Sequence, residues 1–341
     1  DNYKGNAYAL RGLHMFYLLR AHAGMVDGQL MGVPIHLSSE DSKSDFNLPR
    51  NTFKECIDQI MSDFDEALKY LPEQYGDVAE ENVPAKYAQQ GATNAEYNRA
   101  FGTNHRGKID GRIISAFKAQ VAIMAASPAY ASAGVFTYEQ AAKLAADCLK
   151  NFGGLSACDL DGWKWFDNKS LIDGLGTTAD NPKEIIWRGN KTNGADDWDL
   201  GLNQEADNFP PSLYGRGRIN PTQNLVNAFP DANGYPITHE RSVYNDLDPY
   251  SNRDPRLDLY IIYNGCKYKG ATINTDITTA NNDNGLNKIG NSTRTGYYMK
   301  KLLREDCNPD PNAKNPQYHY PVYIRYTEIF LDYAEAANEA W

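Results

Sequence analysis

Residues 322–341 read V-Y-I-R-Y-T-E-I-F-L-D-Y-A-E-A-A-N-E-A-W, and this stretch decides the predicted fold. It follows Pro321, and we predict a helix over its whole length. Small side chains thin its second half, which lets a neighbouring helix approach closely, as in paired-helix repeat proteins; they are Ala334, Ala336, Ala337 and Ala340. Acidic side chains recur at about one-turn spacing and predict a solvated stripe; they are Glu328, Asp332, Glu335 and Glu339.

Four more helices are predicted in the first part of the chain, over residues 3–23, 52–71, 111–126 and 137–152. In the first, apolar and aromatic residues fall at three- and four-residue steps; with His14 they are Ala7, Leu10, Tyr17, Leu18 and Ala21. Two helices begin with the spacing of a capping box; the pairs are Thr52 with Glu55 and Thr137 with Gln140. The polar residues 73–106 are predicted to form a surface excursion.

These patterns predict a mainly α protein with three parts. Residues 1–154 form a scaffold of tetratricopeptide-like helix hairpins, although no strict repeat of about 34 residues is visible. Residues 155–320 are rich in Asn, Asp, Gly, Pro and Tyr, and predict a loop-rich region with short strands, one of them at 184–188. Residues 321–341 form a helix that returns to the scaffold. Both ends of the chain look truncated.

Composition excludes several functional classes. The chain of 341 residues carries a net charge of −10, which disfavours binding to nucleic acid or to anionic lipid. No run approaches the roughly 18 apolar residues that a membrane span needs. Tyrosine outnumbers phenylalanine by 23 to 12, which is typical of surfaces that are half apolar and half hydrogen-bonding.

Several short motifs occur in one order along the chain. Arg325-Tyr-Thr-Glu-Ile-Phe-Leu-Asp-Tyr-Ala-Glu-Ala resembles the R-Y-A-E-x-x-L-x-Y-A-E-A signature of SusD/RagB-like proteins. Glu184-Ile-Ile-Trp, Pro221-Thr-Gln-Asn-Leu-Val, Arg253-Asp-Pro-Arg-Leu and Gly32-Val-Pro-Ile resemble further elements of that family. Members are nutrient-binding lipoproteins on the outer surface of Bacteroidota.

The resemblance implies a function without covalent chemistry. It implies binding of an oligosaccharide or polysaccharide and its delivery to a SusC-like TonB-dependent transporter, with no cofactor. It also implies location on the extracellular face of the outer membrane, through an N-terminal lipidated cysteine that this chain lacks. A peptide-binding protein of the RagB type and a glycan-cleaving enzyme remain as alternatives.

No catalytic or metal-binding motif stands out. The six histidines lack zinc-binding spacing, and there is no nucleophile elbow or phosphate loop. Oxygen-rich stretches at Asp159-Leu-Asp-Gly and Asn281-Asn-Asp-Asn-Gly leave calcium open, although turn formation also explains them. Cys148 and Cys158 could close a short disulfide loop, or remain free thiols.

Residues 196–220 carry the predicted ligand site. Proteins that hold sugars stack an aromatic ring on the C–H face and hydrogen-bond the polar rim, and this segment combines both kinds of group. The predicted ligand-binding residues are Trp198, Asn203, Phe209, Tyr214, Arg216 and Arg218. Starch-binding relatives place part of their aromatic arc in the corresponding segment. Alternatively, Trp198 and Phe209 anchor a loop, which is also the role predicted for Trp163 and Trp165.

Overall fold

The chain divides into two units of different texture, each described here by itself. A computed structural model describes residues 1–176, 180–189 and 200–341, without the side chains of 200–203. The helical unit comprises Asp1–Trp163, Leu175–Asn190 and Pro321–Trp341, and the loop-rich unit comprises Lys164–Gly174 and Lys191–Tyr320. Residues 155–163, 175–176 and 180–189 thus belong to the helical unit, whereas the sequence placed them in the loop-rich region.

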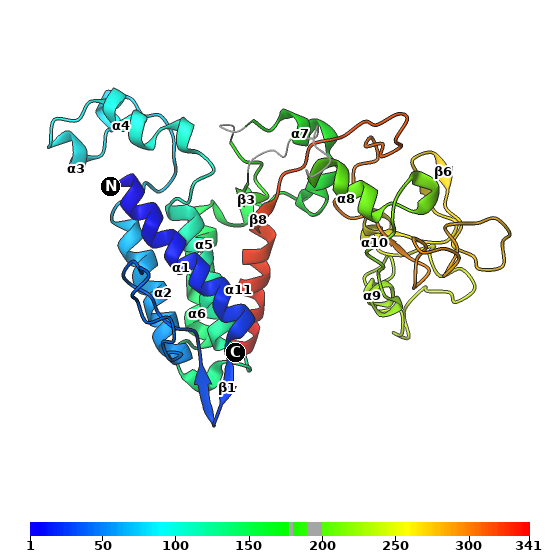
Figure 1. Ribbon diagram of the computed structural model, residues 1–341, viewed down its shortest axis with the longest axis horizontal. Helices are drawn as coiled ribbons and strands as arrows, with labels where there is room; N and C mark the ends of the chain where they lie inside the picture. Colours follow the sequence, from blue (N-terminus) through cyan, green and yellow to red (C-terminus); the bar gives the residue numbers. More distant parts are fainter. Residues whose placement is uncertain (177–179, 190–199) are drawn as a thin grey trace. The chain divides into compact units, whose positions relative to one another are not determined.

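The helical unit is built from helices that pack in pairs around one apolar core. Helix α1 packs on α2, α5 on α6, and the C-terminal α11 on α6 and α5 (Figure 1). This confirms the predicted mainly α scaffold of paired helices. The helices of this unit are α1 (Asn2–His22), α2 (Phe53–Leu68), α3 (Ala85–Ala88), α4 (Asn94–Phe101), α5 (Gly111–Ala126), α6 (Tyr138–Asn151) and α11 (Tyr326–Ala340).

Both predicted capping boxes are present. The Thr52 hydroxyl accepts from the backbone N–H of Glu55 at 3.2 Å, and the Glu55 carboxylate accepts from the Thr52 N–H at 2.8 Å. Thr137 and Gln140 make the same reciprocal pair at the start of α6. Each box satisfies N–H groups that the first helical turn leaves without a partner, which is why these helix starts could be predicted.

The buried face of α1 is not the one that the three- and four-residue steps suggested. Leu10, Tyr17 and Leu18 are exposed, whereas the face around Gly5, Ala9, Gly12, Leu13 and Phe16 is buried. A Cβ at Gly12 would lie 3.0 Å from the Phe64 ring of α2. The glycines therefore let the two helices approach closely, and this contact outweighs the bulk on the opposite face.

The first four residues of the 322–341 stretch are a strand, not a helix. β8 (Val322–Arg325) pairs antiparallel with β3 (Ile185–Arg188), which confirms the strand predicted at 184–188. The Glu184 side chain is fully buried at this junction. Its carboxylate accepts from the Arg325 guanidinium at 3.0 Å and from the Thr327 hydroxyl at 2.9 Å. The backbone N–H and C=O groups of β3 need partners from an adjacent strand, and a helix could not provide them because its own groups bond within the helix. Residues 322–325 therefore form β8, and α11 begins after them.

The remaining strands of the helical unit form the hairpin of β1 (Gly24–Val26) and β2 (Gln29–Met31).

Residues 73–106 hold more structure than the predicted surface excursion. They contain α3 and α4 and a small core of their own; its buried members are Tyr75, Val83, Tyr97 and Phe101. The aromatic spacing in a polar segment was the signal for this core.

The loop-rich unit consists of short elements around two apolar clusters. One cluster contains Phe209, Tyr268 and Tyr298, and the other contains Val226 and Leu257. The elements are α7 (Lys169–Gly174), α8 (Leu200–Asn208), α9 (Gln223–Ala228), α10 (Pro255–Tyr260), β4 (Ile261–Ile262), β5 (Lys267–Tyr268), β6 (Ala271–Thr272) and β7 (Tyr298–Met299). β4 pairs with β7 and β5 with β6, both antiparallel.

The structure also bears on the possible disulfide and on membrane-spanning helices. All five cysteines are free thiols, so the Cys148–Cys158 disulfide is not formed. Cys148 lies buried on α6, where burial raises the pKa of its thiol to about 11. Within the described parts of the chain, none of the helices is both long and apolar enough to cross a bilayer.

Candidate binding site

A short irregular segment, residues 214–218, lies along the end of α8 and forms one wall of the candidate site. The Arg216 N–H donates to the Ala206 carbonyl and the Arg218 N–H donates to the Asp207 carbonyl, each at 2.9 Å. The side chains of Arg216 and Arg218 both extend to Asp207, whereas Gly215 and Gly217 lie against the interior. Tyr214 begins the segment in the left-handed region, so its side chain does not follow the alternation of extended backbone.

The two glycines are required by close packing. A Cβ at Gly215 would lie 1.9 Å from the Phe209 carbonyl oxygen. A Cβ at Gly217, whose φ is +51°, would lie 2.5 Å from the Asn291 carbonyl oxygen. The segment can therefore lie against the interior on its glycine side only, and it turns its tyrosine and arginines outward.

Tyr214 holds its ring in the open at a conformational cost. It follows the 3₁₀ turn Pro211–Leu213 and has a φ of +63°, in the left-handed region that bulky residues rarely adopt. Its side chain is 55% exposed. A hydrogen bond to the Asp310 carboxylate raises the pKa of its hydroxyl. A glycine would suit this backbone better, so the tyrosine side chain is retained against local strain.

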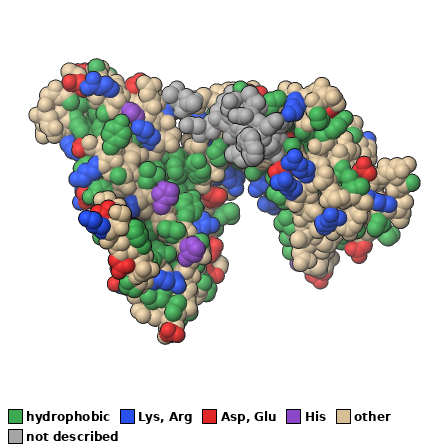
Figure 2. Space-filling view, in the orientation of Figure 1, with side chains coloured by type: hydrophobic (Ala, Val, Ile, Leu, Met, Phe, Trp, Pro, Cys, Tyr) green, Lys and Arg blue, Asp and Glu red, His purple; other side chains and the backbone are tan. Residues whose placement is uncertain are grey.

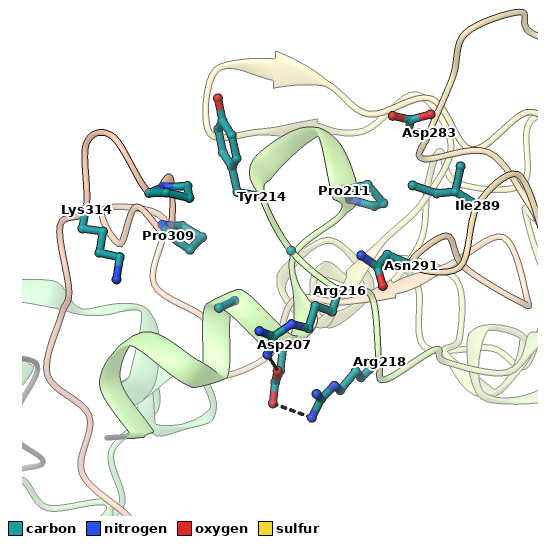
Figure 3. A pocket seen from close by; sticks show the side chains of 13 residues that line it. Asp207, Pro211, Tyr214, Arg216, Arg218, Asp283, Ile289, Asn291, Pro309 and Lys314 are labelled. Carbon is teal, nitrogen blue, oxygen red and sulfur yellow. Dashed lines mark hydrogen bonds and ion pairs between the residues drawn. The ribbon is translucent and has the colours of Figure 1, made fainter. Parts of the chain in front are cut away.

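Asp207 on α8 joins the two arginines. One of its oxygens accepts from Arg216 Nη1 at 2.8 Å and the other accepts from Arg218 Nη1 at 3.0 Å (Figure 3). The arginine side chains are more than half exposed, so each ion pair contributes only about 0.2–1 kcal/mol to stability. The pairs hold the guanidinium groups in place without burying them.

These groups line a cavity of about 870 Å³ within the loop-rich unit. Its other walls come from the segments 283–291 and 309–314, which contribute Asp283, Asn291 and Lys314. Pro211, Ile289, Pro309 and Pro311 supply apolar surface. A volume of this size accommodates a ligand of several sugar rings or a short peptide.

The Asn-rich stretch 281–285 has a structural role beside the cavity. The side chain of Asn284 is buried, accepts from the Ser212 N–H at 2.9 Å and donates to the Ser212 hydroxyl at 2.8 Å. These bonds connect the stretch to the turn that carries Tyr214. Among the described residues, no group of three or more His, Cys, Asp or Glu side chains could hold a metal ion.

Three of the six predicted binding residues, Tyr214, Arg216 and Arg218, lie together on this cavity. Trp198 and the side chain of Asn203 lie outside the described residues. Phe209 is a correction: its ring is fully buried and packs edge-on against Tyr268, with centroids 5.6 Å apart. It anchors the site from inside and offers no face to a ligand, because it belongs to the apolar cluster of the unit.

The sequence did not point to Asp207, Asn291 or Lys314, and it singled out Asp283 only within a stretch that left calcium open. Asp207 lies seven residues before Tyr214, and the others lie about 70 to 100 residues further along. A partial signal existed in Tyr214-Gly-Arg-Gly-Arg, because glycines that alternate with large polar residues indicate an extended segment with one crowded face. The partners of that face depend on tertiary contacts.

The cavity combines one aromatic ring with several charged and polar groups. Both oxygens of Asp207 accept hydrogen bonds from guanidinium groups. The exposed ring, the guanidinium groups and the Asn291 amide offer a stacking surface beside hydrogen-bond donors and acceptors.

Two family models match the chain. One is the SusD family, over residues 183–340, and the other is described as starch-binding associating with outer membrane, over residues 1–93. The chain belongs to the SusD family. The matches place the helical start, the β3–β8 junction, the cavity-lining segments and α11 within SusD-type sequence. No curated protein sequence matches the chain significantly.

Solved SusD-like structures share the fold. A SusD-like carbohydrate-binding protein from Bacteroides fragilis superposes with a TM-score of 0.67 at 19% identity, over 98% of this chain and 54% of its own. A second SusD-like protein from B. fragilis gives a TM-score of 0.65 at 22% identity, over 98% and 57%. The chain therefore spans little more than half the length of these SusD-like structures, and at such identities the likeness concerns the fold alone.

Proposed function

We propose that this protein binds an oligosaccharide at the cavity lined by Tyr214, Arg216, Arg218 and Asn291, and releases it unchanged. The observation that carries the proposal is the conformation of Tyr214. A bulky residue stays in the left-handed region with its ring exposed at the mouth of a cavity, beside two guanidinium groups. Strain of this kind is retained where a side chain serves a function.

The mixture of groups suits a sugar. A pyranose ring has apolar C–H faces, which stack on an aromatic ring, and a rim of hydroxyl groups, which accept from guanidinium and amide N–H groups. An exposed site of this type gives weak affinity per subsite, because stacking must first offset the entropy lost when the ligand is ordered. Membership of the SusD family, described in part as starch-binding, supports the same ligand class.

We further infer that the protein works at the outer surface of the outer membrane and passes its ligand to a SusC-like TonB-dependent transporter. The support is the family description, which names association with the outer membrane. Attachment through a lipidated cysteine upstream of residue 1 belongs to the same proposal. Co-purification of the full-length protein with a transporter of this class tests it, and purification without one contradicts it.

A glycan array followed by calorimetry on the captured glycans tests the binding site. Tyr214→Gly removes the ring and suits the left-handed backbone, so we expect unchanged or higher thermal stability with an affinity at least about fivefold weaker. Tyr333→Ala, at another half-exposed tyrosine on α11, is the matched control and should bind as the native chain does.

Each alternative gives a different outcome. If Tyr214→Gly binds the glycan with full affinity, this cavity is not the binding site. Capture of peptides but of no glycan would favour the RagB-type alternative, and turnover of a bound glycan would favour an enzyme.

A further inference from the structure

The cavity gathers several cationic side chains in a protein of negative net charge. Three cationic side chains, Arg216, Arg218 and Lys314, line it beside Asp207 and Asp283. A third carboxylate, Asp310, is hydrogen-bonded to the Tyr214 hydroxyl. The chain as a whole carries a charge of −10. Lys and Arg side chains also gather on the face of the loop-rich unit that Figure 2 shows. A site that binds only neutral sugars has no need of three cationic side chains, since hydroxyl groups are recognised equally well by neutral donors.

The two arginines are arranged for a further acceptor. Each guanidinium has five N–H donors, and each donates through a single nitrogen, Nη1, to one oxygen of Asp207. Among the described residues, no other side-chain hydrogen bond of either arginine is present. Figure 3 shows the two groups converging on the Asp207 carboxylate, with the Tyr214 ring further along the cavity and pointing away from them. One carboxylate therefore positions two cations and neutralises only one of them.

The glycine pattern fixes this pair in space. Gly215 and Gly217 have no room for a Cβ, and the backbone of Arg216 and Arg218 is hydrogen-bonded to α8. The packed backbone thus sets where the two side chains start, and the shared Asp207 carboxylate orients their guanidinium groups. A preorganised pair of this kind can bind a two- or three-oxygen anion with less loss of conformational entropy than two independent side chains.

We propose that the ligand is an acidic oligosaccharide, and that Arg216 and Arg218 together bind its acid group while Tyr214 stacks on a neighbouring ring. The proposal rests on the sugar-binding function proposed above. The shared chemistry is an oxyanion on a sugar, either the carboxylate of a uronic acid or a sulfate ester. Lys314, on the segment 309–314, places a further positive charge on the same cavity.

Calorimetry of the full chain with matched ligand pairs tests the proposal. Oligogalacturonides are compared with their methyl esters, and sulfated chondroitin oligosaccharides with their desulfated forms, so the two arms separate carboxylate from sulfate. In at least one arm we expect the form with the proposed acid group to bind at least tenfold more tightly than its counterpart. Raising the salt concentration from about 0.05 to about 0.5 M should reduce that advantage several-fold, because the arginines are exposed.

Substitutions of the two arginines test whether they cause the preference for the acidic ligand. The double variant Arg216→Gln/Arg218→Gln should abolish the difference between the paired ligands. Arg216→Lys/Arg218→Lys, which keeps the charge without the planar donor fork, should retain part of it. Arg241→Gln, an exposed arginine of the same unit outside the cavity, is the matched control and should change nothing.

Equal affinity for both members of each pair, or an undiminished preference in the glutamine double variant, overturns the proposal. If the neutral glycans then still bind in a Tyr214-dependent manner, the proposed sugar-binding function stands alone. If neither kind of glycan binds, both proposals fail.

Discussion

At the scale of single residues, two aspartates show how surroundings set the behaviour of one residue type. Asp63 on α2 is buried, but its carboxylate accepts from Arg11 Nε at 2.8 Å and from Gln59 at 2.9 Å. Asp332 on α11 faces α6 without such a cation, and one of its oxygens is buried without a partner. The predicted solvated acidic stripe of α11 is therefore wrong at Asp332.

Burial raises the pKa of Asp332 to about 7, and Glu328 and Glu335 on the same helix add to the shift. Cys148, on the facing α6, has its own thiol pKa raised mainly by burial. The folded state holds the Asp332 proton more tightly than the unfolded state, whose pKa is near 3.8. The contribution of Asp332 to stability is thus fully present below about pH 4 and is lost as the pH rises through about 7.

Asp332→Asn mimics the protonated form and should stabilise the protein at pH 8 by about 1–3 kcal/mol. At pH 4 the gain should be near zero. Denaturant unfolding at the two pH values measures both. Glu339→Gln, on an exposed position of the same helix, is the control and should show no pH-dependent gain of this size. Equal effects of Asp332→Asn at both pH values would contradict the buried-carboxylate explanation.

At the scale of elements, the contact of α1 with α2 depends on missing side chains. Gly12 lies in the interior of α1, where its lack of a side chain costs about 1 kcal/mol of helix propensity. A Cβ there would lie 3.0 Å from the Phe64 ring and 3.3 Å from Asp63 Cβ. Close approach of the helices therefore outweighs local helix preference.

Gly12→Val should lower the free energy of unfolding by about 1–3 kcal/mol, although valine is the better helix former, because its branches would enter the occupied space beside Phe64. Gly24→Val is the matched control. Gly24 starts β1 and has no atom within 4 Å of its Cβ position, so the change should be within about 0.5 kcal/mol of neutral. Chemical denaturation compares the two. A neutral Gly12→Val would show that α1 can shift away from α2 without loss.

At the scale of the whole molecule, two separate sets of apolar clusters occupy the two units. Ile57 is fully buried in the core of the helical unit and Leu257 is fully buried in the loop-rich unit. The chain passes between the units at residues 163–164, 174–175, 190–191 and 320–321. Each unit thus has a core of its own, which allows separate unfolding.

We expect scanning calorimetry to resolve two transitions. Ile57→Ala should lower the temperature of one, and Leu257→Ala that of the other, each by an amount that corresponds to about 2–5 kcal/mol. The two variants serve as controls for each other. A single transition that both variants shift together would show that the units unfold as one.

The sequence predicted the features that depend on neighbours in the chain. Helix starts at Thr52 and Thr137 follow from reciprocal side-chain and backbone hydrogen bonds within four residues. The strand at 184–188 follows from a short apolar run, and the Arg325-Tyr-Thr-Glu motif indicated the family. The motif also has a local meaning in the structure, since Arg325 and Thr327 satisfy the buried Glu184 carboxylate.

Tertiary structure decided which faces are buried and which residues meet. Helix α1 carries bulk on one face and glycines on the other, and only the position of α2 selects the glycine face. Phe209 and Tyr214 look alike as loop aromatics, yet Phe209 joins an apolar cluster and Tyr214 is exposed, on a backbone conformation that is unfavourable for a bulky residue. Asp207, Asn291 and Lys314 reach one cavity from segments up to about 100 residues apart. The physical reason is that burial and cavity lining depend on long-range packing, which the local pattern of side chains does not specify.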